Sequence, residues 1–162
     1  MPPREDVLYQ LATGLEYIHK NEMIHRDIKP QNVLIWVNSN NNEVLMKWAD
    51  FGLSKRINER GTFSMSGEIG VKGTENWLAP ELLKILMQEI EESMEGSEKA
   101  TPSLRRGSVK SDVFAEGLVF GYFYLDGEHI FGPIQNIRNN IIRNNPVNIS
   151  SKLTTPLEAK KF

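Results

Sequence analysis

The chain has 162 residues, of which 40% are hydrophobic and 25% are charged, and its formal net charge is −2. That length and composition are typical of about one globular domain, and the small acidic charge excludes a general attraction to nucleic acid or anionic membranes. With no cysteine and no apolar run long enough to cross a bilayer, the sequence also excludes disulfides, thiolate metal sites and a membrane segment in this chain.

The first predicted element is an amphipathic helix over about 4–20. Its apolar stripe recurs at helical spacing and consists of Leu8, Leu11, Ala12, Leu15 and Ile18. Two short strands are predicted next, over 33–37 and 44–48, separated by a run of Asn and Ser that tolerates the left-handed backbone of a turn. We therefore expect a hairpin, which brings the residue before the first strand and the residues after the second to the same end.

The segment 54–76 is rich in Gly, Ser, Thr and charge and shows no sustained period, so we expect a mobile loop. A helix is predicted over 80–90. The following residues, 91–110, are polar and are expected to form a disordered insertion.

A buried helix is predicted over 112–125, because this stretch is apolar nearly all round. Within it, Glu116 is an acidic residue whose packing the sequence does not explain. A further amphipathic helix is suggested by four isoleucines, namely Ile134, Ile137, Ile141 and Ile142. The end of the chain is loop-like, with a last helical pattern from Pro156 onward.

Three short motifs stand in order along the chain. His25–Asn32 reads HRDIKPQN, Asp50–Gly52 reads DFG, and Ala79–Glu81 reads APE. A tripeptide alone is weak, but an eight-residue signature with two correctly placed followers is specific. Together they resemble the catalytic loop, metal-binding turn and activation-segment end of a protein kinase. The resemblance implies an α+β, protein-kinase-like fold, mainly the helical C-terminal lobe, with a short β-hairpin bearing the catalytic loop.

Four residues of these motifs have the chemistry that phosphoryl transfer needs, which is an in-line nucleophile and neutralised phosphate charge. Asp27 is the candidate base for a substrate hydroxyl. Lys29 can reach the transferred phosphate as a point charge, and lysine here is typical of serine/threonine kinases. Asn32 and Asp50 offer hard oxygen ligands for Mg²⁺. The expected cofactors are therefore ATP and Mg²⁺.

Other motif residues have expected supporting roles. In the family, an arginine at the position of Arg26 grips a phosphorylated activation loop, and the alternative is an ordinary surface arginine. His25 and Phe51 are expected to be packing residues rather than chemical ones.

Three more structural residues are implied by the resemblance. Thr74 is expected to contact Asp27 and Lys29 rather than to be phosphorylated. Asp112 is expected to begin the buried helix and to accept backbone hydrogen bonds from the catalytic loop. Glu81 normally pairs with an arginine in the final helices; with no arginine after Arg143, a buried Glu81 would be costly.

The stretch Gly73–Glu81 narrows the resemblance to a subfamily of these kinases, because most serine/threonine kinases have tyrosine where Trp77 stands. With serines upstream and His129–Gly132 reading HIFG downstream, the chain is similar, over about 7–142, to the inositol-requiring kinase/endoribonuclease sensors of the unfolded protein response. The implied partners are a protein substrate or the chain itself, with a possible homodimer in a full-length protein and no direct nucleic acid binding by this segment. The implied localisation is cytoplasmic, or the cytosolic face of the endoplasmic reticulum membrane in a longer protein.

Autophosphorylation in the activation loop is implied by the same resemblance. The most plausible sites are Ser64 and Ser66, with Thr62 as a further candidate, and the alternative is that all three are ordinary polar loop residues. Arg105–Ser108 also has the pattern of a basic-directed phosphorylation site in a flexible segment, although such short patterns are weak.

Several kinase features are missing from the sequence: the glycine-rich phosphate loop, the strand lysine and its partner glutamate. We therefore expect residues 1–162 to be a partial kinase domain without the N-lobe and the final helices, carrying the polar insertion 91–110. Two functions remain open. One is a serine/threonine kinase acting in unfolded-protein-response signalling, and the other is a catalytically inactive kinase-lobe fragment that acts as a protein-interaction module.

Overall fold

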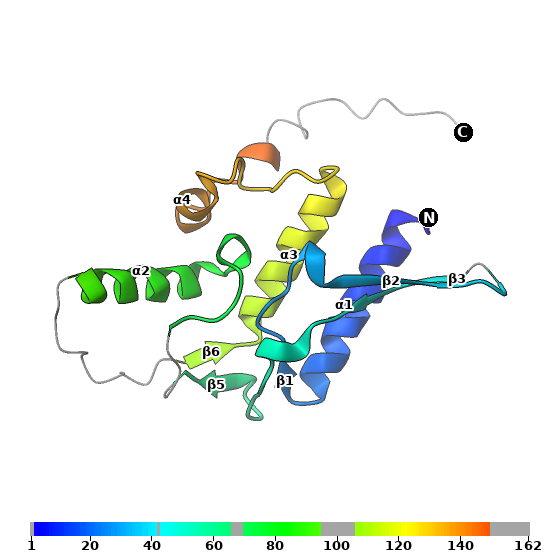
Figure 1. The fold of residues 1–162 in the computed structure, drawn as a ribbon, viewed down its shortest axis with the longest axis horizontal. Coiled ribbons are helices and arrows are strands. Elements are labelled where there is room, and N and C mark those ends of the chain that lie inside the picture. The colour runs from blue at the N-terminus through cyan, green and yellow to red at the C-terminus, as the bar shows by residue number, and fades with distance from the viewer. Residues whose placement is uncertain (1, 42, 66–69, 95–105, 150–162) are drawn as a thin grey trace.

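The computed structural model describes residues 2–41, 43–65, 70–94 and 106–149. Helices and short strands are mixed along the chain (Figure 1). The elements are α1 (Arg4–Lys20), β1 (Met23–Ile24), η1 (Pro30–Asn32), β2 (Val33–Asn38), β3 (Glu43–Trp48), η2 (Phe51–Leu53), β4 (Lys55–Arg56), β5 (Thr62–Ser64), η3 (Glu75–Trp77), α2 (Pro80–Met94), β6 (Arg106–Ser108), α3 (Lys110–Tyr124) and α4 (Ile137–Ile142), where η marks a 3₁₀ helix. Within the described ranges, no helix is long and apolar enough to cross a membrane.

The hairpin β2–β3 is fixed to α1. It lies where the sequence predicts one, with Val33 opposite Trp48 at its open end. The Trp48 indole N–H donates to the Leu11 carbonyl at 3.0 Å. Gln10 joins helix to strand at a second point, because its side-chain oxygen accepts the Met46 N–H at 2.7 Å. Helix α1 thereby packs against β3 and one side of α3, in a core made of Val7, Leu11, Leu15, Ile18, Ile28, Met46, Trp48, Ala115 and Val119. Of the predicted apolar stripe, Leu11, Leu15 and Ile18 are buried, whereas Leu8 and Ala12 are only half-buried.

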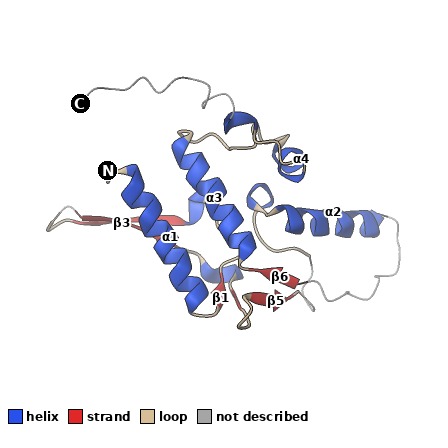
Figure 2. Cartoon of the chain, turned by 180° about the vertical axis from the view of Figure 1, so that it is seen from behind, coloured by secondary structure: helices blue, strands red, loops and turns tan. Residues whose placement is uncertain are grey.

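Helices α2 and α4 lie on another side of α3 (Figures 1 and 2), and a second core lies on this side. It contains Ile24, Phe63, Met65, Leu78, Leu82, Leu83, Leu118, Leu125, Ile130, Phe131, Ile137 and Ile141. Because α3 serves both cores, two of its sides must be apolar, which explains its sequence. The expected burial on every side is wrong, however, since Val113 is 54% exposed and Tyr124 is 49% exposed.

The segment predicted as a mobile loop contains ordered pieces. β4 pairs with β1, and β5 pairs with β6, each antiparallel. These strands are only two or three residues long, and no alternating pattern can be seen in so short a stretch. The strand pairs come from distant parts of the chain, which local sequence patterns do not report.

The predicted insertion 91–110 is too wide at both ends. Residues 91–94 continue α2, and Arg106–Ser108 is the strand β6. Of the predicted insertion, residues 95–105 lie outside the described residues. The helical pattern predicted from Pro156 onward also lies outside them. Polar residues at the end of α2 mark its solvent side rather than a break in the helix. The helix predicted from four isoleucines is shorter than expected, because Ile134 lies outside α4 and is 70% exposed.

Gly107 in β6 is where the Phe63 ring of β5 lies closest to the backbone. A Cβ added at Gly107 would lie 2.2 Å from that ring, which is closer than any real contact. Phe63 itself is 6% exposed. Glycine at this position therefore lets an aromatic ring lie directly on the neighbouring strand.

Replacing Gly107 by alanine is expected to destabilise the protein by about 1–3 kcal/mol, because the ring or the strand must move to make room. The measurement is the free energy of unfolding in urea. Gly117→Ala is the matched control: a Cβ there meets nothing within 4 Å, and alanine in a helix is worth about 0.5–1 kcal/mol over glycine. Equal stability changes for the two variants would contradict the close approach of Phe63.

Candidate active site

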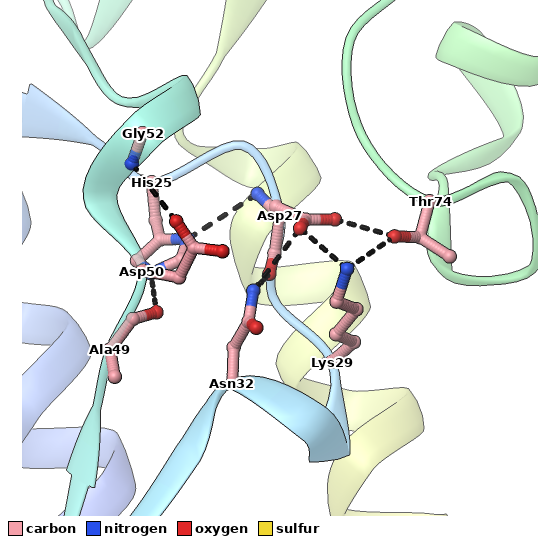
Figure 3. A network of polar contacts seen from close by, with 8 residues as sticks. All are labelled: His25, Asp27, Lys29, Asn32, Ala49, Asp50, Gly52 and Thr74. Atoms are coloured by element: carbon pink, nitrogen blue, oxygen red, sulfur yellow. Dashed lines mark hydrogen bonds and ion pairs between the residues drawn. The ribbon is translucent and has the colours of Figure 1, made fainter.

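The open end of the hairpin gathers the acidic and amide residues of the first two motifs. Asn32 directly precedes β2, and its carbonyl accepts the Ala49 N–H at 2.9 Å. Asp50 follows Ala49, so both candidate Mg²⁺ ligands lie at this end, beside Asp27 (Figure 3). Asn32 and Asp50 thus lie at the same end of the hairpin, as the sequence predicted.

Asp27 is the centre of a polar network (Figure 3). One of its carboxylate oxygens accepts the Lys29 ammonium at 2.7 Å and the Asn32 amide N–H at 3.1 Å. The other accepts the Thr74 hydroxyl at 2.7 Å. Lys29 also donates to the Thr74 hydroxyl oxygen at 2.8 Å, which closes a ring of three residues from two distant segments.

The pKa of Asp27 is lowered from its ordinary value of 3.8. Burial alone would raise it, but the hydrogen bonds from Lys29, Thr74 and Asn32, together with the Lys29 charge, outweigh that effect. The carboxylate is therefore ionised at neutral pH. It is only 8% exposed, so its hydrogen bonds fix its orientation.

Asp112, at the start of α3, holds the backbone that leads to Asp27. Its two carboxylate oxygens accept the His25 N–H at 2.8 Å and the Arg26 N–H at 2.9 Å. The His19 imidazole lies 3.0 Å from the same oxygen that His25 uses. Asp112 is 2% exposed, so these bonds compensate the cost of burying its charge. The hydrogen bonds expected from the sequence are present, and His19 is an addition that no sequence pattern indicated.

Two residues of the site have left-handed backbone conformations, Arg26 with φ 70° and Asp50 with φ 62°. Such angles are uncommon in residues other than glycine and are kept where the surroundings determine them. At Arg26 the surroundings are the Asp112 carboxylate and the Leu53 carbonyl, which accepts the guanidinium Nε–H. At Asp50 the side chain accepts the Gly52 N–H at 3.2 Å.

The Arg26 guanidinium lies over the Phe63 ring, 5.3 Å from its centroid. The Lys55 ammonium lies 5.6 Å from the same centroid and donates to the Ser64 carbonyl at 2.7 Å. Cations over an aromatic face are attracted by its quadrupole. Arg26 therefore contacts Phe63, in the segment that carries the predicted phosphorylation sites.

His25 is fully buried and lies 5.0 Å from Phe51, measured between ring centroids. Its Nδ1 accepts the Asp27 N–H at 3.3 Å, so Nε2 carries the proton and donates to the Ala49 carbonyl at 3.0 Å. His25 is thus a packed connector between the two motifs. Phe51 is 46% exposed, so its ring is only partly packed by the described residues.

The predicted phosphorylation sites have different surroundings. Ser64 is exposed in β5, whereas the Thr62 hydroxyl donates to the Asn58 side chain at 3.0 Å; Ser66 lies outside the described residues. The flexible segment expected around Ser108 is wrong, because Ser108 belongs to β6.

Glu81 is exposed at the start of α2. The cost that a buried Glu81 without a partner would carry therefore does not arise. A carboxylate in the first turn of a helix and in contact with water is a stable arrangement without a partner arginine.

Sequence reasoning missed two residues that hold η3, the turn after Thr74. Arg138 of α4 forms an ion pair with Glu75 at 2.9 Å. The His129 imidazole lies 3.1 Å from the Asn76 carbonyl, and burial lowers the pKa of His129 although that hydrogen bond opposes the change. Only the HIFG stretch hinted at His129, and nothing local indicated Arg138.

Comparison with known proteins places the sequence in a family. The family model described as protein kinase domain matches residues 3–161. The chain is 33% identical over 144 residues to "Sensor for unfolded proteins in the ER ire1" of Schizosaccharomyces pombe, covering 86% of the chain and 13% of that protein. It is 35% identical over 142 residues to "Serine/threonine-protein kinase/endoribonuclease IRE2" of Homo sapiens, covering 88% of the chain and 14% of that protein.

A third relative, "Serine/threonine-protein kinase/endoribonuclease ire-1" of Caenorhabditis elegans, is 35% identical over 139 residues, which are 85% of the chain and 12% of that protein. The chain thus spans only a small part of the length of the curated relatives it matches. The family model covers nearly all of the chain. The chain therefore belongs to the protein kinase family and is similar, within it, to kinase/endoribonuclease sensors of unfolded proteins.

Proposed function

We propose that this chain is the catalytic-loop part of a serine/threonine protein kinase, which transfers the γ-phosphoryl group of ATP to Ser or Thr hydroxyls. The observation that carries the proposal is the Asp27 carboxylate, ionised and oriented by Lys29, Thr74 and Asn32. A carboxylate held in this way can accept the proton of an attacking hydroxyl.

Each neighbour of Asp27 has a part in this chemistry. Asp27 orients the substrate hydroxyl through a hydrogen bond and takes its proton as the oxygen–phosphorus bond forms. The Lys29 ammonium stabilises negative charge on the transferred phosphoryl group. Thr74 links the base to η3, so the segment that follows the activation loop is fixed relative to the base.

The expected Mg²⁺ ion suits the donor set at the hairpin end. Asn32 donates its amide N–H groups to Asp27, which leaves its carbonyl oxygen as the atom available for a cation. Asp50 is exposed and uses one oxygen for the Gly52 N–H. Hard oxygen atoms of this kind suit Mg²⁺. When bound, the ion would neutralise charge on the ATP phosphates.

We further propose that residues 1–162 act as part of a longer kinase in unfolded-protein-response signalling, with itself or another protein as substrate and a location at the cytosolic face of the endoplasmic reticulum. The relatives' names support the setting, and Arg26 beside the segment with Ser64 supports autophosphorylation there. The test begins with the native polypeptide, purified with an antibody against residues 88–106. Transfer of label from γ-labelled ATP to serine or threonine supports the proposal, and its absence from an intact polypeptide with Mg²⁺ contradicts it.

By itself, the 162-residue chain is expected to bind Mg-ATP weakly or not at all. The candidates in this sequence are Lys29 for the phosphates and Asn32 and Asp50 for Mg²⁺, and a kinase site also uses a glycine-rich loop and a strand lysine that this sequence lacks. Isothermal titration calorimetry of the chain with ATP and Mg²⁺ measures this. A dissociation constant in the low micromolar range would contradict the expectation.

A second function is favoured by one surface. Strand β2 has exposed apolar side chains on both of its faces, namely Leu34, Ile35, Trp36 and Val37. Contiguous exposed apolar residues often mark interaction sites, which suits an inactive lobe that binds another protein. A cellular phenotype that survives Asp27→Asn but is lost when Leu34 and Ile35 are both changed to serine would favour this function over catalysis.

A further inference from the structure

Glu116 is a buried acid that the proposed chemistry does not use. It lies in α3, one helical turn after Asp112, and is 8% exposed. Its Oε1 atom has no hydrogen-bond partner among the described residues. An isolated buried carboxylate is costly, so this residue needs an explanation.

The surroundings of Glu116 combine charge with access to water. It lines a surface pocket of about 440 Å³ between α1 and α3. The other charged or titratable residues of the pocket come from α1 and are Glu16, His19 and Lys20. Lys20 is engaged with Glu16 at 2.7 Å, and both are mostly exposed. His19, the other basic residue of the pocket lining, contacts Asp112 instead.

His19 connects Glu116 to the catalytic loop. Its Nε2 lies 3.0 Å from Asp112 Oδ2, the oxygen that also accepts the His25 N–H. A negative charge on Glu116 would repel the Asp112 carboxylate and compete with it for His19. Both effects would weaken the hydrogen bonds by which Asp112 holds the backbone of His25 and Arg26.

Burial raises the pKa of Glu116 from its ordinary value of 4.5 to about 7; the His19 charge opposes this rise, and the Asp112 carboxylate adds to it. The folded chain therefore keeps the proton over a range in which the unfolded chain has lost it. The stabilising effect of the neutral acid is fully present below about pH 4.5 and is lost as the pH rises through about 7.

We propose that Glu116 is a positioning residue for the catalytic loop. In its neutral form it leaves Asp112 to hold His25 and Arg26, and in its ionised form it loosens that hold. The loop that carries Asp27 is then firmer below neutral pH than above it. The consequence for catalysis rests on the proposed kinase function, whereas the effect of Glu116 on the hydrogen bonds from His25 and Arg26 to Asp112 does not.

The test is amide hydrogen exchange of the full chain by NMR at about pH 6 and about pH 8, corrected for intrinsic exchange rates. We expect the protection of the His25 and Arg26 amides to fall several-fold at the higher pH in the wild type, and to stay unchanged in Glu116→Gln. Glu91→Gln, at an exposed position of α2, should behave as the wild type. If the protection of the two amides falls as much in Glu116→Gln as in the wild type, the proposal is overturned.

A second measurement does not depend on any variant. A ¹³C titration of the Glu116 carboxyl group in the wild-type chain should give an apparent pKa near 7, and a value near 4.5 would overturn the proposal. Failure of the kinase function is distinguishable, because it would abolish phosphoryl transfer at every pH and leave the exchange result as it is. In an active kinase, kcat should fall from about pH 6 to about pH 8 in the wild type more than in Glu116→Gln, with KM for ATP unchanged.

Discussion

Replacing Asp27 by asparagine is expected to lower phosphoryl transfer by about 10²- to 10⁴-fold, the usual contribution of a positioned base. Asparagine has the same shape and can still accept the Thr74 hydroxyl, but it cannot take the proton of an attacking hydroxyl. The Lys29 charge also loses its partner, which stands 2.7 Å away. The measurement is label transfer from γ-labelled ATP by the native polypeptide that contains this chain.

Two controls make the Asp27 result interpretable. Asp126→Asn changes an exposed acid on the surface and should leave phosphoryl transfer as in the wild type. Unfolding of the Asp27→Asn variant should remain cooperative, which shows that the loss is chemical. Retention of more than about a tenth of wild-type activity would show that Asp27 is not the base.

The site was largely visible in the sequence because its residues lie close together in the chain and have fixed spacings. The helix over 4–20 and the two strands were visible for a similar reason, since each has a regular apolar pattern of its own. The hairpin then follows from the turn residues between the strands. These local signals are sufficient to place Asn32 and Asp50 at the same end of the hairpin.

The parts that could not be predicted depend on contacts between distant segments. β5 and β6 are joined by Phe63 resting on Gly107, and a glycine between polar residues looks like loop chemistry when read locally. The exposure of Glu81 depends on what packs around α2 rather than on its own motif. The His19 contact to Asp112 joins residues 93 positions apart, and a single histidine near the end of an amphipathic helix carries no sequence signal.

Replacing Asp112 by asparagine is expected to destabilise the fold by about 2–4 kcal/mol, as when a buried donor loses its charged acceptor. The carboxylate serves the His25 and Arg26 N–H groups and the His19 ring at once. An amide can offer only one oxygen, so its NH₂ group must face a donor. A loss of about 2–4 kcal/mol is a large part of the total stability of a domain, which is about 5–15 kcal/mol. The measurement is the free energy of unfolding in urea.

The matched control for Asp112 is again Asp126→Asn. Asp126 forms its ion pair with Arg4 at 2.9 Å, where both side chains are more than half exposed, and such pairs contribute about 0–1 kcal/mol. Asparagine also tolerates the left-handed backbone of residue 126, with φ 53°. The two substitutions are chemically identical, so the difference between them isolates the burial of Asp112 and its three contacts. Equal losses of stability would mean that Asp112 does not hold the catalytic loop, and the arrangement of Arg26 and Asp27 would then need another cause.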